Sequence, residues 1–154
     1  MSVTEEGSGA SADGQTLAEA KWGDALGMGF TIVPGVLIRA QAKLGLDTTD
    51  LAILLNILLH WWKPGDWPYP PPSLIARRIG VSTRTVERRL ESLEERNFLI
   101  RHRSEKSRDG LALRRIELTG LVLRLEAFAR AGLEMRKDIY ARGAGRSADD
   151  AAHF

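Results

Sequence analysis

The chain has 154 residues, of which 44% are hydrophobic and 27% charged, and it contains no cysteine. This composition is typical of one globular domain with a packed core and polar tails. The lack of cysteine excludes disulfides, thiolate nucleophiles and cysteine-based zinc sites. No basic residue precedes Lys21, which argues against a signal peptide, and the longest apolar run, residues 51–59, is too short to span a bilayer. We therefore expect a cytoplasmic protein with no membrane partner.

The formal net charge of +2 hides an uneven distribution of charge along the chain. Residues 73–116 contain eleven Arg and one Lys against five Glu and one Asp, whereas residues 1–20 contain four acids and no base. A basic segment in a chain with an acidic tail is typical of proteins that bind nucleic acids. Arg-rich surfaces also occur without such a ligand, so the charge alone decides little.

The N-terminal part of the chain shows little hydrophobic periodicity. Residues 1–22, rich in Gly, Ser, Ala and Glu, are predicted to be a disordered acidic tail. Residues 29–46 are predicted to form a short strand or extended arm, followed by a helical turn after Pro34. Their apolar side chains are expected to pack on the core.

A longer helix is predicted over residues 50–62, because leucines recur there on one face, and its cap is expected at Asp47, Thr48 or Thr49. The next segment, W-W-K-P-G-D-W-P-Y-P-P-P from Trp61 to Pro72, is predicted to be a rigid loop because its prolines restrict the backbone. Its aromatic side chains either cover a small core, which is the commoner role, or form a stacking platform for single-stranded bases. We also regard this loop as a candidate site for a protein partner.

Residues 73–96 read S-L-I-A-R-R-I-G-V-S-T-R-T-V-E-R-R-L-E-S-L-E-E-R and are predicted to form two helices joined by a tight turn. Gly80 has no Cβ, so it can adopt the left-handed conformation that the turn requires. Ala76 is small where the two helices would cross. Ser82 can cap the second helix by accepting a hydrogen bond from a free N–H group. The spacing of Ala76, Gly80 and Val86 is that of a helix-turn-helix.

The charges of the second helix oppose its dipole. The arginines lie in its first half and the glutamates in its second half: Arg84, Arg88 and Arg89, then Glu91, Glu94 and Glu95. The helix dipole favours the reverse order by roughly 0.3–1 kcal/mol for each well-placed charge. A polyanion bound at the first half would resolve this conflict. The alternative is an ordinary solvated helix face.

These residues resemble the winged helix-turn-helix DNA-binding family over about residues 47–118. The resemblance implies a recognition helix that begins at Ser82 and lies in the DNA major groove. Position 89 is apolar in many simple helix-turn-helix units but is Arg here, which leaves the direction of this side chain open. Backbone N–H groups near Ser73 are expected to bind a phosphate. The expected contacts from the recognition helix are Ser82, Thr83, Arg84, Thr85, Arg88 and Arg89.

Two strands are predicted at residues 98–103 and 111–118, joined by a polar tip that ends in Asp-Gly. A hairpin directly after the recognition helix corresponds to the wing of the resembled family. Arg114 and Arg115 point to opposite faces of their strand, so at most one joins a DNA-binding surface. The alternative is a solvated hairpin tip. The wing residues expected to contact phosphate or the minor groove are Arg101, Arg103, Lys106 and Arg108.

A final helix is predicted over residues 119–142, because apolar or small residues recur there at steps of three and four. Such a seam packs either on its own domain or on a second copy of the chain, and Gly132 weakens a long coiled coil. Residues 143–154 are predicted to be a flexible tail. We expect a homodimer whose seam contains Leu121, Leu125, Phe128, Met135 and Ile139.

The sequence thus predicts a mainly α fold with a small β-hairpin. A winged helix-turn-helix of three helices and a wing occupies residues 23–118, and a C-terminal helix is added in residues 119–142. The predicted function is sequence-specific binding of double-stranded DNA by a nucleoid-associated transcriptional regulator, most simply a repressor. The alternatives are a plasmid or phage replication-initiation or partition protein, and a winged-helix adaptor that binds protein rather than DNA. No catalytic constellation is found and the histidines lack metal-ligand spacing, so we expect no enzyme activity, no metal and no cofactor.

Overall fold

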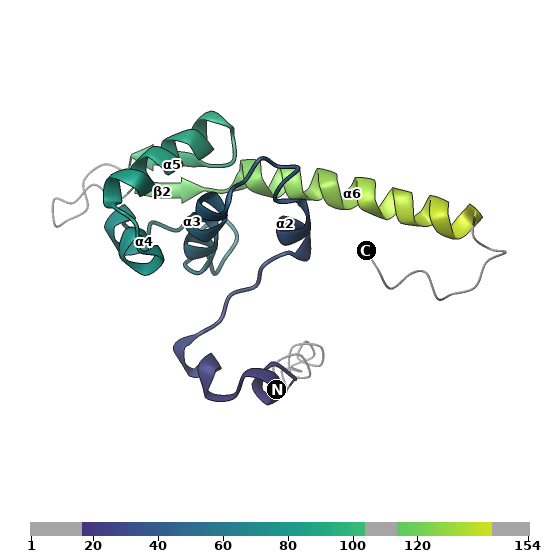
Figure 1. The fold of residues 1–154 in the computed structure, drawn as a ribbon, viewed down its shortest axis with the longest axis horizontal. Helices are drawn as coiled ribbons and strands as arrows, with labels where there is room; N and C mark the ends of the chain where they lie inside the picture. Colours follow the sequence, from purple (N-terminus) through teal and green to yellow (C-terminus); the bar gives the residue numbers. More distant parts are fainter. Residues whose placement is uncertain (1–16, 104–113, 143–154) are drawn as a thin grey trace, which may run out of the picture. The chain divides into compact units, whose positions relative to one another are not determined.

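The computed structural model describes residues 17–103 and 114–142 (Figure 1). The chain divides into two compact units, residues 1–32 and residues 33–154. In the first unit, residues 17–22 are helical and lead into the 3-10 helix η1 (Gly23–Met28), which contains no buried residue. The predicted tail at residues 143–154 and most of that at residues 1–22 lie outside the described residues.

The second unit is mainly helical, with one antiparallel pair of strands. This arrangement confirms the predicted fold class of a helix-turn-helix with a small hairpin and an added C-terminal helix. In chain order, its elements are α2 (Gly35–Ala40), α3 (Thr48–Leu58), α4 (Pro72–Ile79), α5 (Thr83–Glu95), β1 (Ile100–Arg103), β2 (Arg114–Glu117) and α6 (Thr119–Arg142).

The core of the second unit is built from one apolar face of each major helix. Side chains at helical spacing are buried in α3 and in α5, because each helix turns one face towards the others. The segment after α5 adds Phe98 and Leu99, both almost fully buried. The central buried side chains are Ile53, Leu54 and Ile57 of α3, Ile75 of α4, Val86, Leu90 and Leu93 of α5, and Leu118 and Leu121 at the start of α6.

The start of α3 shows how the local sequence fixes a helix boundary. Asp47 is the N-cap, and its side chain accepts a hydrogen bond from the backbone N–H of Asp50 at 2.8 Å. The side chain of Asp50 accepts in return from the N–H of Asp47, which completes a capping box. This confirms Asp47 among the three predicted caps. The helix ends at Leu58, four residues before the predicted end.

The hairpin has the predicted order, but its described strands are short. Ile100 pairs with Glu117 and Arg103 with Arg114, in an antiparallel register. Arg101 and Ile116 are opposite each other and therefore share a face, the one on which Ile116 is buried. The hairpin tip, including the predicted Asp-Gly turn, lies outside the described residues.

The last helix, α6, combines two environments along one face (Figure 1). Its first turns pack on the core, where Leu121 and Leu125 are buried and Phe128 is partly buried. Met135 and Ile139, later on the same face, are 66% and 55% exposed. The predicted seam is therefore divided: Leu121 and Leu125 are buried in their own chain, Phe128 is partly buried there, and Met135 and Ile139 are exposed.

Candidate nucleic-acid interface

The turn between α4 and α5 has the geometry that its sequence predicts. Gly80 ends α4 with φ 75° and ψ 34°, in the left-handed region, and its N–H donates to the carbonyl oxygen of Ala76. Val81 then packs against the core. The Ser82 hydroxyl caps α5 by accepting a hydrogen bond from the Thr85 N–H at 3.1 Å. The turn and the cap together bring the first turns of α5 to the surface.

Arg84 and Arg88 are the free cations of this surface. Both side chains are exposed, and neither forms an ion pair with another residue in ranges 17–103 and 114–142. They are four residues apart on one helix face, so their charges repel each other. Thr83 is exposed beside them, whereas the Thr85 hydroxyl lies 2.9 Å from that of Ser82. An anion on this face would relieve the repulsion.

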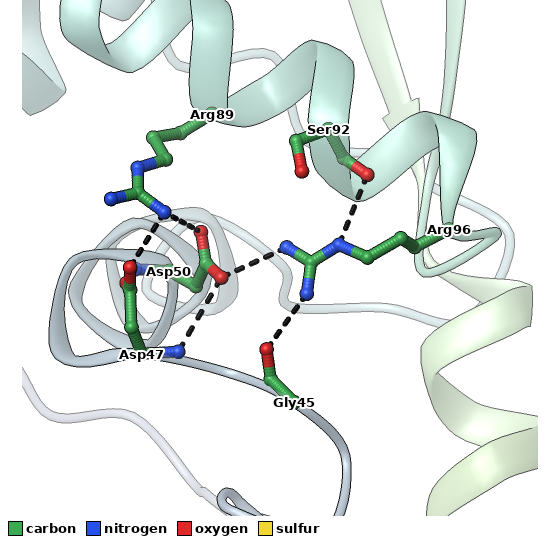
Figure 2. Close-up of polar contacts among 6 residues, drawn as sticks. All are labelled: Gly45, Asp47, Asp50, Arg89, Ser92 and Arg96. Carbon is green, nitrogen blue, oxygen red and sulfur yellow. Dashed lines mark hydrogen bonds and ion pairs between the residues drawn. The ribbon is translucent and has the colours of Figure 1, made fainter.

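Arg89 has a different environment from Arg84 and Arg88. Its Nη1 lies 2.6 Å from Oδ2 of Asp47 and 3.6 Å from Oδ1 of Asp50, so the guanidinium points to the start of α3 (Figure 2). The expectation that Arg89 contacts DNA is therefore corrected: its charge is used inside the domain. The open question of its direction is answered by these two ion pairs.

Asp50 is the centre of a buried ionic cluster that joins α3 to α5 (Figure 2). The residue is only 2% exposed, and its Oδ2 accepts a hydrogen bond from Nη2 of Arg96 at 2.8 Å. Arg96 also donates to the carbonyl oxygens of Gly45, at 2.9 Å, and Ser92, at 3.2 Å. Asp50 Oδ1 makes no hydrogen bond among the described residues, although Arg89 neutralises it from 3.6 Å. The cluster fixes the orientation of α5 relative to α3.

Asp47 remains charged in this setting. The hydrogen bond from the Asp50 N–H lowers the pKa of Asp47 most strongly; burial opposes this effect, and the charge of Arg89 adds to it. A charged Asp47 is the form that caps a helix N-terminus and pairs with arginine. The cap of α3 and the placement of Arg89 therefore depend on the same carboxylate.

The wing is held against α5 by a second ionic cluster. Arg101 donates from its backbone N–H and its Nε to the carboxylate of Glu94, each at 2.8 Å, and its Nη1 lies 3.3 Å from Glu87. Arg114 lies 3.6 Å from Glu87 on the same side. These residues and Glu91 line an open polar cavity of about 550 Å³ between α5 and the hairpin. The predicted DNA contact of Arg101 is corrected, because only 16% of its side chain is exposed and its charge is paired.

Glu94 accepts the two shortest hydrogen bonds from Arg101 in this second cluster. Burial raises the pKa of Glu94, but the hydrogen bonds from Arg101 and its positive charge lower it by more, so the carboxyl group titrates below its usual range. Two of the charges that oppose the dipole of α5 are therefore compensated within the protein, Arg89 by Asp47 and Asp50, and Glu94 by Arg101. Arg84 and Arg88 in the first half, and Glu91 and Glu95 in the second half, have no ion pair among the described residues.

The structure describes only some of the remaining residues predicted to contact DNA. Ser73 is exposed in the first turn of α4, but that turn offers few free N–H groups because Pro72 has none and those of Leu74 and Ile75 donate to Pro71. Arg103 lies in β1, opposite Arg114, although its side chain is outside the description. The predicted wing contacts Lys106 and Arg108 lie outside the described residues.

Sequence reasoning missed several residues that shape this surface. Asp50 was taken only as the first residue of an apolar helix, yet it anchors both Arg89 and Arg96. Its position three residues after Asp47 was the available signal, because that spacing forms a capping box. Arg77, exposed on α4, forms no ion pair with any residue of the described segments. It extends the basic surface beyond α5.

Within residues 17–103 and 114–142, no group of three His, Asp or Glu side chains is arranged to hold a metal ion. No described helix is both long enough and apolar enough to cross a membrane.

Comparison with protein families identifies the central part of the chain. Residues 44–99 match the sequence model of a family described as a helix-turn-helix domain. This segment is similar to helix-turn-helix domains. The match covers α3, α4 and α5 together with the buried Phe98 and Leu99, so the Asp50 cluster lies within the domain. Helix-turn-helix domains typically place their second helix in the DNA major groove.

Two solved structures align with most of the chain. The N-terminal domain of DnaD protein from Geobacillus kaustophilus HTA426 aligns with a TM-score of 0.52 and 18% identity, covering 88% of this chain and 99% of that one. The transcriptional regulator PA3341 aligns with a TM-score of 0.41 and 22% identity, covering 90% of this chain and 82% of that one. The first similarity shows a shared fold. No curated protein sequence matches the chain.

Proposed function

We propose that the helix-turn-helix domain binds specific sites in double-stranded DNA and that the protein regulates transcription, most simply as a repressor that occupies an operator. The observation that carries this proposal is the unpaired state of Arg84 and Arg88 among the described residues, beside arginines that are paired. In helix-turn-helix docking, the first turns of the second helix reach base edges. Arginine binds a guanine edge with two hydrogen bonds, and the Thr83 methyl group can contact thymine.

The two ionic clusters support this proposal by making the surface rigid. Asp50 fixes α5 to α3, and Glu87 with Glu94 fixes the wing to α5. A preorganised surface loses less conformational entropy on binding than a flexible one. The glutamates in the second half of α5 also repel phosphate, so they confine DNA to the half that carries Arg84 and Arg88.

Replacing both free arginines tests the interface. We expect Arg84→Ala/Arg88→Ala to weaken binding to a fluorescent duplex at least about tenfold at low salt, because charged hydrogen bonds are worth about 1.5–3 kcal/mol each. The measurement is fluorescence anisotropy across a salt series. Each arginine that contacts phosphate contributes a slope near −0.9 in log K against log[salt], and this part disappears in the variant.

A charge-matched double variant distinguishes local contact with DNA from a general effect of net charge on affinity. Arg39→Ala/Arg130→Ala removes the same charge from exposed positions on α2 and α6. It is expected to keep the affinity within about threefold, since charges far from the interface are largely screened. No binding by the wild type at low salt would remove the proposal, and equal losses in both double variants would reduce it to nonspecific attraction. Selection from a random duplex pool then tests sequence specificity.

The dimer part of the proposal rests on the distal half of α6. Two exposed apolar side chains, Met135 and Ile139, continue the face that is buried further back in the same helix. A second copy of this helix would cover them, as in a short coiled coil. A two-fold dimer also suits the half-sites that helix-turn-helix domains bind.

Charges placed in this face are expected to separate the two copies. Met135→Glu/Ile139→Glu should convert a dimer to a monomer in sedimentation velocity, because two buried carboxylates per chain would lie in an apolar seam. Leu123→Glu is the control, since Leu123 is 58% exposed but lies on another face of α6. A monomeric wild type, or a dimer that survives the double variant, would contradict this part of the proposal.

A further inference from the structure

The loop between α3 and α4 is fixed in place by contacts at several points. The rings of Trp61 and Trp67 stack with centroids 5.8 Å apart, and both side chains pack against the core. Trp61 Nε1–H donates to the carbonyl oxygen of Lys63 at 2.9 Å. The carbonyl oxygen of Pro68 accepts from the N–H of Ile116 in β2 at 2.8 Å. The predicted core-covering role thus applies to Trp61 and Trp67.

Trp62 and Tyr69 have a different role in this loop. Their side chains are 67% and 50% exposed, and neither ring has an aromatic or cationic partner among the described residues. Both line an open cleft of about 400 Å³, together with Trp67, Pro70 and Leu74. A rigid backbone therefore holds two flat aromatic groups at the surface without a packing function.

One cation, Arg78, contacts a residue of the cleft lining. His60 lines the cleft, and Nη1 of Arg78 lies 3.0 Å from its Nε2. Burial, and then the charge of Arg78, lower the pKa of His60, so at pH 7 the neutral imidazole accepts this hydrogen bond and leaves the guanidinium charge uncompensated. Lys63 is exposed in the same loop, while Asp66 is the single acid of the lining.

We propose that this cleft binds unpaired nucleotide bases, which stack on Trp62 and Tyr69 while their phosphates lie near Arg78 and Lys63. Aromatic side chains combined with a basic groove are the general solution for single-stranded nucleic acids. An apolar peptide would use the rings but not the cations at the edge. The inference rests on the proposed DNA-binding function in taking nucleic acid as the ligand.

The cleft adjoins the helix-turn-helix, because Leu74 in its lining belongs to α4. A DNA with a duplex segment and an unpaired segment would engage both sites at once, and the two contacts would reinforce each other.

The test measures single-stranded and duplex binding separately. The probe is a fluorescein-labelled oligothymidylate of about 12 nucleotides, a length that one such site can cover. Trp62→Ala/Tyr69→Ala is expected to weaken its binding at least about fivefold, the factor that corresponds to about 1 kcal/mol of stacking, and to leave duplex binding unchanged. Both rings are exposed, so their removal leaves the core intact.

Two control variants and a competing peptide decide the outcome. Trp22→Ala, which removes a tryptophan that is 58% exposed in the first unit, should leave single-strand binding unchanged. Arg84→Ala/Arg88→Ala should lose duplex binding and keep single-strand binding, so a failure of the proposed function is distinguishable from a failure of this inference. The inference is overturned by a wild type that does not bind the oligonucleotide, by an equal loss in Trp22→Ala, or by a proline-rich peptide that occupies the cleft while the oligonucleotide does not.

Discussion

Replacing Asp50 with alanine is expected to lower the free energy of unfolding by about 3 kcal/mol. The change removes the buried carboxylate that Arg96 contacts at 2.8 Å and Arg89 at 3.6 Å. It also removes half of the capping box of α3, because Asp50 Oδ2 accepts from the N–H of Asp47. The loss lies at the lower end for broken buried ion pairs, since both arginine side chains are 32% exposed and water can hydrate their charges in the variant.

Urea denaturation followed by circular dichroism measures this loss. Asp138→Ala is the matched control, because Asp138 is exposed on α6, and it should change stability by less than about 0.5 kcal/mol. Asp50→Asn keeps the shape of the side chain and removes its charge. The stability lost in Asp50→Asn therefore measures the ionic contribution, and the additional stability lost in Asp50→Ala measures the packing contribution. A loss below about 1 kcal/mol in Asp50→Ala would show that the cluster contributes little to folding.

The features that sequence reasoning predicted correctly are local in the chain. Gly80 needs a left-handed backbone because of its place in a turn, and Ser82 caps the helix that starts at the next residue. The apolar spacing of α5 places Val86 and Leu90 on one buried face. Each of these relations spans four residues or fewer, so the sequence contains all the information that they need.

The corrected predictions depend on contacts between distant segments. Arg89 and Arg101 both look like free cations in the sequence, but tertiary structure places Asp47 beside one and Glu94 beside the other. Arg96 and Asp50 are 46 positions apart, and no local pattern links them. A charge that functions in binding is thus distinguished from a structural charge by its partners, which only the fold supplies.

The predicted continuous seam of α6 differs from the structure for a related reason. Its apolar residues recur at steps of three and four from Leu121 to Ile139, which predicts one continuous interface. The domain core covers only the first part of that helix, and the side chains of residues 133–140 are exposed. A periodic pattern gives the face of a helix, whereas the size of the core determines how much of that face is buried.

Replacing Gly120 with alanine is expected to lower the free energy of unfolding by about 3 kcal/mol, the upper end for overpacked sites. A Cβ at this position would overlap the carbonyl oxygen of Asn97 and lie 3.0 Å from its carbonyl carbon. Relief is difficult, because Asn97 has φ 58° in the turn after α5, and the Leu121 N–H donates to the carbonyl oxygen of Phe98 at 2.9 Å. Backbone atoms on both sides would have to separate.

Gly132 provides a control for Gly120 within the same helix. A Cβ at Gly132 would have no neighbour within 4 Å among the described residues, so Gly132→Ala should stabilise α6 by up to about 1 kcal/mol through helix propensity alone. Thermal unfolding of both variants, at one protein concentration, gives the comparison. Opposite signs are expected, because Gly120 lets α6 start against the turn that follows α5, whereas Gly132 lies in open space. Equal stability of the two variants would show that this close approach is not required for α6 to start against the turn that follows α5.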